Sequence, residues 1–168
     1  MQRLAYAPTR ISRQPLGFTL IELMIAIVVM AVLASIAFPS YLNAVRKSRR
    51  AEAISALTWI QQAEERYRAN NTLYTTSAAA PPAGIGSAPA GSGYYTYSIY
   101  ADTTTGTSYV ATANANAGTS QAADTNCAGM QLQIIAGTVS YGSCKGGCAA
   151  VVADPAANLI DAANCWGR

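Results

Sequence analysis

Four cysteines near the C-terminal end are the residues whose chemistry is most readily assigned. Cys127, Cys144, Cys148 and Cys165 all lie in the last 42 residues of the chain. An even number of cysteines in a short segment is typical of disulfides formed in an oxidising compartment. The spacing of Cys144 and Cys148 would also suit a zinc site. We favour disulfides, because the chain has no histidine and an apolar segment long enough to cross a membrane precedes the cysteines.

The sequence offers no constellation for catalysis. Histidine is absent, and the eight acidic residues are scattered, so no acid–base pair or activated nucleophile stands out. We predict that the chain is not an enzyme and needs no cofactor. A calcium site would draw on the oxygen-bearing side chains of Asp154, Asn158, Asp161 and Asn164. Their spacing matches no calcium-binding loop, so we predict turn and cap roles for them and no metal site.

The net charge of +3 comes entirely from the first residues of the chain. Arg3, Arg10 and Arg13 supply it, and the remaining residues hold eight cations against eight anions. From Asn71 onward there are two cations and four anions. A head that binds polyanions through a general basic surface is therefore not indicated, and DNA as a partner is not predicted from charge.

A long apolar segment follows the basic N-terminal residues. Residues 18–38 contain one charged residue, Glu22. At 1.5 Å per residue they would form a helix of roughly 32 Å, which is enough to cross a bilayer core. A secretory signal peptide has a shorter apolar core with a small-residue cleavage site after it. Here the small residue, Gly17, comes before the apolar run.

Residues 17–25, Gly-Phe-Thr-Leu-Ile-Glu-Leu-Met-Ile, resemble the prepilin signature of type IV pilins and type II secretion pseudopilins. The resemblance implies that residues 1–17 are a leader peptide. A membrane-bound prepilin peptidase would cut between Gly17 and Phe18, and the new N-terminal residue would be methylated. Residues 18–39 would then be the transmembrane helix, which later becomes the filament core.

Glu22 and Pro39 are the two unusual residues of that helix. An ionised carboxylate in a bilayer is costly and is usually paired or functional. We expect Glu22 to pair with the amine at Phe18, in its own chain or a neighbour's, and to fix the register of an incoming subunit. The alternative is a tolerated charge near the membrane boundary. Pro39 removes a helix hydrogen bond, so we expect a kink or local melting there.

Residues 40–74 predict an amphipathic helix followed by a turn. Small and apolar residues recur at spacings of three and four, which makes one helix face suited to a sheet. They are Ala53, Ala56, Leu57, Ile60, Ala63 and Tyr67. Trp59 lies about 100° away from this face. It is either a contact between subunits or an edge residue of its own core.

A basic cluster follows the apolar segment and consists of Arg46, Lys47, Arg49 and Arg50. Three interpretations remain open. The cluster could face solvent or anionic lipid headgroups, or it could pair with carboxylates of adjacent subunits. Binding of DNA is the third and least favoured, because no aromatic residues are interleaved with the cations.

Residues 75–168 predict a globular head. Residues 75–93 are rich in Thr, Ser, Ala, Pro and Gly and form a loop with little to bury. Alternating patterns then predict strands at residues 94–100, 109–113, 130–134 and 138–141. One face of this antiparallel meander would pack on the helix and the other would face outward. The expected fold class is α+β, with a long N-terminal helix on a sheet of about four strands, held together by disulfides.

The stretch of residues 51–74 resembles the same family, and so does the placing of Cys127 before a strand and of Cys165-Trp166 near the end. The resemblance implies a Cys127–Cys165 disulfide, with Cys144–Cys148 as an additional pair. A hairpin turning at Ala136-Gly137 could instead bring Cys127 near Cys144, so this alternative stays open.

The resemblance implies a structural subunit of a type IV pilus, of the type IVa-like major or minor pilins of Gram-negative bacteria. Its partners would be other pilin subunits, prepilin peptidase, the pilus assembly platform and the inner membrane before assembly. The head would be periplasmic at first and extracellular in the pilus. Adhesion, twitching motility and DNA uptake would belong to the whole filament. The alternatives are a DNA-binding minor pilin for natural competence and a type II secretion pseudopilin.

Overall fold

The computed structural model of the chain describes residues 17–87, 91, 93–102, 106–149 and 159–167. It contains the helix α1 (Leu20–Arg68), followed by the strands β1 (Tyr95–Ala101), β2 (Ser108–Ala115), β3 (Gly129–Ile135) and β4 (Thr138–Cys144). The chain divides into two compact units, Met1–Tyr41 and Leu42–Arg168. This is the predicted α+β class, and the four strands lie where the alternation placed them, within two residues at each end except at the end of β4, three residues beyond the predicted end.

The described part of the first unit is helical from Leu20 and apolar on all sides. Thr19 caps the helix, because its Oγ1 accepts a hydrogen bond of 3.2 Å from the Glu22 backbone N–H. α1 continues through Pro39 without interruption, so the local melting that the proline suggested does not occur in this structure.

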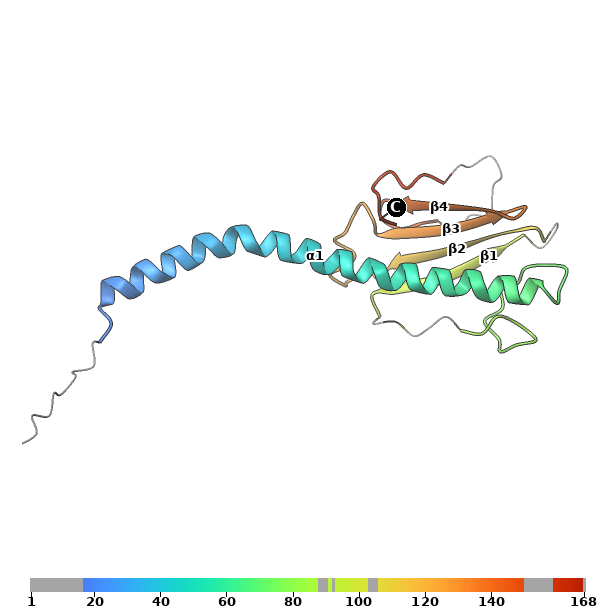
Figure 1. The fold of residues 1–168 in the computed structure, drawn as a ribbon, viewed down its shortest axis with the longest axis horizontal. Helices are drawn as coiled ribbons and strands as arrows, with labels where there is room; N and C mark the ends of the chain where they lie inside the picture. The colour runs from blue at the N-terminus through green and yellow to red at the C-terminus, as the bar shows by residue number, and fades with distance from the viewer. Residues whose placement is uncertain (1–16, 88–90, 92, 103–105, 150–158, 168) are drawn as a thin grey trace, which may run out of the picture. The chain divides into compact units, whose positions relative to one another are not determined.

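The second unit is built on an antiparallel meander. The strands lie in the order β1-β2-β3-β4, and each pairs with its neighbour in sequence (Figure 1). The register places Tyr97 opposite Ala113 and Leu132 opposite Tyr141. Since strand side chains alternate between faces, this register gathers the large apolar residues of all four strands on one face.

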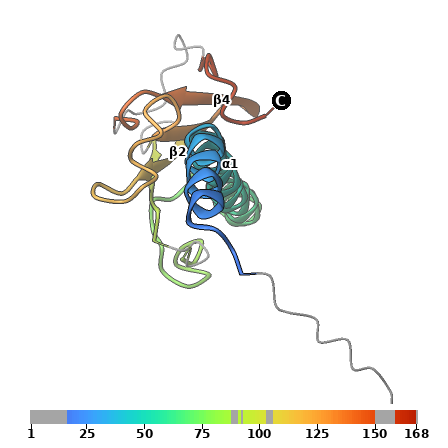
Figure 2. The same cartoon turned by 90° about the vertical axis from the view of Figure 1, so that its left-hand side faces the viewer.

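The part of α1 that belongs to this unit covers that apolar face (Figure 2). The predicted helix stripe is confirmed, with Ala53, Leu57 and Ile60 fully enclosed and Tyr67 half-buried beside them. They meet the largest enclosed sheet residues, Tyr109, Met130, Leu132 and Ile134. Burial of apolar surface, which contributes about 25 cal/mol of free energy per Å², is the main interaction that holds α1 on the sheet.

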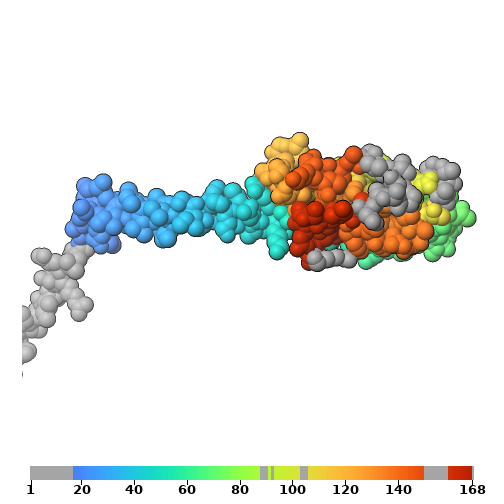
Figure 3. Space-filling model, turned by 90° about the horizontal axis from the view of Figure 1, so that it is seen from above, coloured from blue at the N-terminus to red at the C-terminus, as the bar shows by residue number. Residues whose placement is uncertain are grey.

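The outward face of the sheet is less open than the alternation predicted. Val110, Thr112 and Gln133 point away from α1 and are nevertheless buried. The last described segment, residues 159–167, accounts for part of the cover at β4. A Cβ built at Gly142 would lie 3.0 Å from the Leu159 Cβ. In the space-filling view this segment, in red, lies beside the orange residues of β4 (Figure 3).

The same C-terminal segment protects the free edge of β4. The Ser143 N–H donates to the Ile160 carbonyl at 3.3 Å. Further along, the indole N–H of Trp166 donates to the Gly142 carbonyl at 2.9 Å, and its ring lies 4.7 Å from that of Tyr141. An exposed strand edge is a template for unwanted pairing, and here the chain's own end occupies it.

Candidate functional site

The N-terminal unit presents the first candidate site, the segment around Gly17, Phe18 and Glu22. Gly17 is exposed, and a Cβ built on it would meet no atom within 4 Å. Nothing in the described fold therefore requires glycine at this position. Phe18 is 85% exposed. A requirement for these two residues would have to come from another protein that recognises them.

Glu22 also stands where it can contribute to the start of α1. It lies three residues after the cap Thr19, the position from which a glutamate side chain can complete a capping box. A carboxylate there also interacts favourably with the positive end of the helix dipole. A test of Glu22 in assembly must therefore distinguish its role there from its contribution to the start of α1.

The apolar side chains of α1 before Tyr41 are exposed to a degree that is unusual for a folded protein. Leu23, Val28 and Leu33 are each more than half exposed. α1 is long and apolar enough to cross a membrane, and no part of its most apolar stretch is buried within the chain. Exposed apolar surface of this extent marks a membrane or protein interface.

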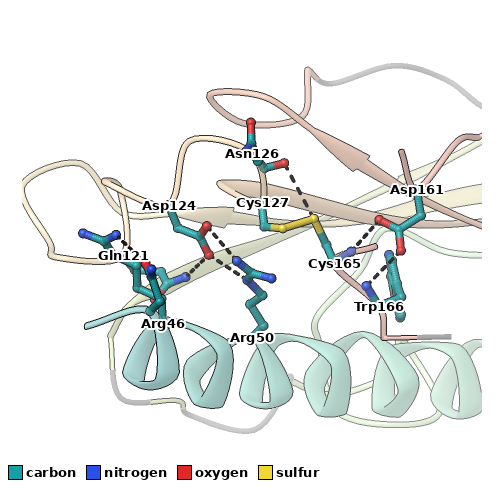
Figure 4. A network of polar contacts seen from close by, with 10 residues as sticks. Arg46, Arg50, Gln121, Asp124, Asn126, Cys127, Asp161, Cys165 and Trp166 are labelled. Carbon is teal, nitrogen blue, oxygen red and sulfur yellow. Dashed lines mark hydrogen bonds and ion pairs between the residues drawn. A yellow bond between two sulfur atoms is a disulfide. The ribbon is translucent and has the colours of Figure 1, made fainter. Parts of the chain in front are cut away.

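The predicted basic cluster does not act as one surface in the structure. Arg50 makes a bidentate ion pair with Asp124, with Nε and Nη2 at 2.7 and 2.8 Å from the two carboxylate oxygens (Figure 4). Gln121 donates to the same carboxylate at 3.0 Å. Arg50 thus holds the loop between β2 and β3 on α1, since bidentate pairs fix geometry as well as charge.

Arg49 is also engaged within the head. Its guanidinium lies 3.8 Å from the centre of the Tyr94 ring, and its Nη1 donates to Ser120. Arg46 is half-buried and makes a long hydrogen bond of 3.4 Å to Asn43, and Lys47 is exposed. Two members of the cluster therefore position their own head, while Arg46 and Lys47 keep a surface available to other molecules.

Trp59 packs against its own head. It is half-buried beside the core, and its ring lies 3.8 Å from the place where a Cβ of Gly86 would be. Of the two interpretations of Trp59, the structure supplies the contact within the chain. It does so through residues 75–87, whose composition had suggested little to bury. Ile85, 5% exposed, joins the core and was missed because it is a single apolar residue among Ala, Pro, Gly and Ser.

The cysteines form the two pairs that the family resemblance implied. Cys127 bonds Cys165, and Cys144 bonds Cys148. Cys148 is further fixed by Asn114, whose side chain both donates to and accepts from its backbone at 3.0 and 2.6 Å. Position 129 requires glycine, because a Cβ there would lie 2.4 Å from the Cys148 backbone nitrogen.

Asp161 orders the chain around Cys165. Its two carboxylate oxygens accept from the backbone N–H groups of Cys165 and Trp166 at 2.8 and 2.9 Å (Figure 4). This is the turn role predicted for it. Asn164, also weighed for calcium, lies in the same turn, where its N–H donates to the Asp161 carbonyl at 3.0 Å. Asp154 and Asn158, the remaining two residues weighed for calcium, lie outside the described residues. Among the described residues no group of three or more His, Cys, Asp or Glu could hold a metal ion.

An N-terminal apolar helix with a Gly-Phe-x-x-x-Glu start and a disulfide-linked head on its second half defines a type IV pilin-like protein. Comparisons with known families agree. A family model for the prokaryotic N-terminal methylation motif matches residues 13–38. A second model, described as type IV minor pilin ComP, DNA uptake sequence receptor, matches residues 39–131, more than half of the chain. The chain belongs to this family of pilins.

Curated relatives give a similar result over a shorter stretch. The chain is 36% identical over 61 residues to type II secretion system core protein G of Klebsiella pneumoniae, covering 36% of this chain and 44% of the relative. Core protein G of Vibrio cholerae is 31% identical over 65 residues, or 39% and 44% of the two chains. The chain thus matches less than half of these relatives' length. All these matches are structural subunits and not enzymes, as predicted.

Proposed function

We propose that the chain is made as a precursor, cut between Gly17 and Phe18 by a prepilin peptidase, and built into a type IV pilus filament. The observation that carries the proposal is the apolar surface of residues 18–41, which its own chain leaves exposed. A bilayer would cover this surface first. After extraction, the helices of neighbouring pilin subunits would cover it.

Location and partners follow from this course. The precursor sits in the inner membrane with its head on the periplasmic side, where the two disulfides can form. An assembly platform then moves it into the extracellular filament, which contains copies of itself or other pilins. Glu22 pairs with the methylated amine at Phe18 and sets the register. Adhesion and twitching motility would be properties of the complete filament.

Replacing Gly17 with leucine is expected to stop processing while leaving the fold intact, because no atom lies within 4 Å of a Cβ at this position. The test is co-expression of the full precursor with a prepilin peptidase, followed by intact-mass measurement. The wild-type chain should lose residues 1–17, and Gly17→Leu should keep them. Thr19→Ser, which retains the capping hydroxyl, serves as the matched control and should be cut normally. Cleavage of Gly17→Leu at the same place would refute the assigned processing site.

A DNA-receptor pilin is the second candidate, and the family match favours it, because the matched family is described as a DNA uptake sequence receptor. The cations that would carry it are few. Arg49 and Arg50 are engaged within the head, while Lys47 and Lys145 are exposed. Fluorescence anisotropy of residues 42–168 with labelled duplex DNA, repeated in rising salt, would decide this point. Binding that discriminates between DNA sequences would establish the receptor role.

A type II secretion pseudopilin is the third candidate, and the relatives named core protein G favour it. It shares the membrane helix and the processing site with a pilin, so these features do not separate the two. The separating observation is where the processed protein is found. A pilin is recovered in surface filaments, and a pseudopilin stays in the cell envelope.

A further inference from the structure

Glu64 is a buried carboxyl group near the C-terminal end of α1 to which filament assembly assigns no role. Its side chain is 0% exposed. One oxygen, Oε2, accepts a hydrogen bond of 3.2 Å from the Thr75 backbone N–H. The other oxygen, Oε1, is buried and has no hydrogen-bond partner among the described residues. Unpartnered buried oxygens are rare in folded proteins and call for an explanation.

The groups packed around Glu64 do not neutralise it. Glu65, beside it on α1, is acidic and accepts a hydrogen bond of 3.1 Å from the Tyr74 hydroxyl. Arg68, one turn further, lies over the Tyr74 ring at 5.2 Å. Its Nη1 is also buried without a hydrogen-bond partner, and no ion pair joins it to Glu64 in the described part of the chain. From β2, the buried Tyr109 hydroxyl also lacks a partner among the described residues. Tyr74 and Thr75 belong to the loop after α1, and the Tyr74 ring packs against that of Tyr109. Tyr141 of β4 adds to the rise in the pKa of Tyr109.

Burial and the charge of Glu65 act in the same direction on Glu64. Burial raises the pKa of Glu64 from 4.5 to about 7, the N–H of Thr75 opposes this rise, and the neighbouring Glu65 adds to it. Burial also raises the pKa of Tyr109, so that hydroxyl stays neutral. The group that exchanges a proton near neutral pH in this part of the head is therefore Glu64.

Thr75 is the first residue of the segment 75–87, which two internal backbone hydrogen bonds close into a loop. The Ile85 N–H donates to the Ser77 carbonyl at 3.1 Å, and the Gly86 N–H donates to the Ala79 carbonyl at 2.8 Å. The segment meets the rest of the head through Thr75 at one end and through Ile85 and Gly86 at the other. Between it and the end of α1 lies a cavity of about 310 Å³, walled by Tyr67, Arg66, Pro81 and Pro82.

We propose that Glu64 is a proton-dependent latch that holds residues 75–87 against the head when protonated and loosens them when ionised. The neutral carboxyl fits the buried site, because one oxygen accepts from Thr75 and an uncharged group needs no cation beside it. The ionised carboxylate would be left buried with one hydrogen bond and without an ion pair among the described residues. Its escape toward water requires the start of the segment to move.

The sign of the effect follows from linkage. A carboxyl whose pKa is higher in the folded state binds its proton more tightly there than in the unfolded chain. Its contribution to stability is complete below about pH 4.5, decreases as the pH rises, and is gone above about pH 7. Loosening of residues 75–87 should accordingly appear as the pH passes through 7.

The test is hydrogen exchange at the Thr75 amide in the full mature chain in detergent micelles, at pH 5.5 and pH 8.5. Rates are corrected for the intrinsic pH dependence of exchange. In the wild-type chain, protection at Thr75 should fall at least about tenfold between the two pH values, since one pKa unit of coupling corresponds to a factor of ten. Glu64→Gln, which keeps the oxygen acceptor, should lose this pH dependence. Glu65→Gln, the exposed neighbour, should retain most of it.

Two results of the exchange experiment would overturn the latch. One is protection at Thr75 that does not change with pH in the wild-type chain. The other is an equal change in wild type and Glu64→Gln. Carbon-13 NMR titration of the Glu64 carboxyl in the wild-type chain needs no substitution, so it decides the question even if Glu64→Gln fails to fold. A midpoint near 7 supports the latch, and a midpoint near 4.5 refutes it.

Discussion

Alanine and glutamine at position 22 are both expected to abolish incorporation of the subunit into filaments. In the proposed filament the negative charge of Glu22 meets the amine at Phe18, in a membrane or a helix bundle from which water is excluded. Both substitutions remove that charge, and an amine left unpaired in such surroundings carries a large desolvation cost. The measurement is the amount of each variant in sheared filaments relative to the amount in the envelope of the same cells.

The pair of variants separates two roles that a single alanine variant would confuse. Glu22 occupies the position from which a glutamate can complete a capping box with Thr19, and glutamine can replace glutamate in such a box. If Glu22→Gln assembled normally while Glu22→Ala did not, capping would explain the residue and the charge pairing would be wrong. Thr19→Ala gives the complementary control. It weakens the cap by about 1 kcal/mol but keeps the charge, so it should still assemble.

Removing the Cys127–Cys165 disulfide by a double alanine substitution is expected to cost the head about 4 kcal/mol of unfolding free energy. Removing Cys144–Cys148 in the same way should cost about 2 kcal/mol. The two bridges close sequence separations of 38 and 4 residues, and a longer closed loop removes more entropy from the unfolded chain. Both pairs have buried members, so the comparison varies loop length more than environment.

Urea unfolding of residues 42–168 under oxidising conditions measures both losses, since this part of the chain forms a compact unit. The Cys127–Cys165 variant should also loosen Trp166, whose position next to Cys165 fixes it against Tyr141. A fall in the near-ultraviolet signal of tryptophan would report that change. Equal losses for the two double variants would contradict the entropic argument. A larger loss for Cys144–Cys148 would indicate that the Asn114 contacts depend on that bridge.

Residue pattern was sufficient for the elements with a regular period. The three- and four-residue spacing of Ala53, Leu57 and Ile60 defines the helix face, and alternation defines four strands, because each pattern reflects which side of the element is buried. The burial of residues on the sheet face that points away from α1 was not predictable in this way. Val110 and Thr112 look like ordinary outward-facing strand residues until the fold shows them buried.

Contacts between segments far apart in the sequence account for most of what the sequence analysis missed. Arg50 reads as part of a basic surface, but its partner Asp124 lies 74 residues away in the loop between β2 and β3. Glu64 reads as one of several charges on a helix, and only the position of Tyr109 and Thr75 shows that it is enclosed. Its signal was present in the spacing, since it follows Leu57 by seven residues and Ile60 by four and so lies on the buried helix face, unlike the exposed Glu65.

The cysteine pairing illustrates how a family resemblance and a fold contribute differently. Spacing left the partner of Cys127 open between Cys144 and Cys165. The resemblance favoured Cys165, and the fold supplies a physical reason for that pair. Asp161 organises the turn before Cys165, and Trp166 then fills the edge of β4. These contacts bring Cys165 to Cys127, while Cys144 is held by its short loop above Gly129.

Mass spectrometry of filaments sheared from the native bacterium would show whether this chain is processed at Phe18 and built into a surface filament, if the N-terminal peptide is identified and peptide abundances are measured. We expect a peptide that begins at N-methylated Phe18, from a subunit that is either abundant or rare in the filament. Complete absence of the chain from filaments, with the processed protein present in the envelope, would contradict it.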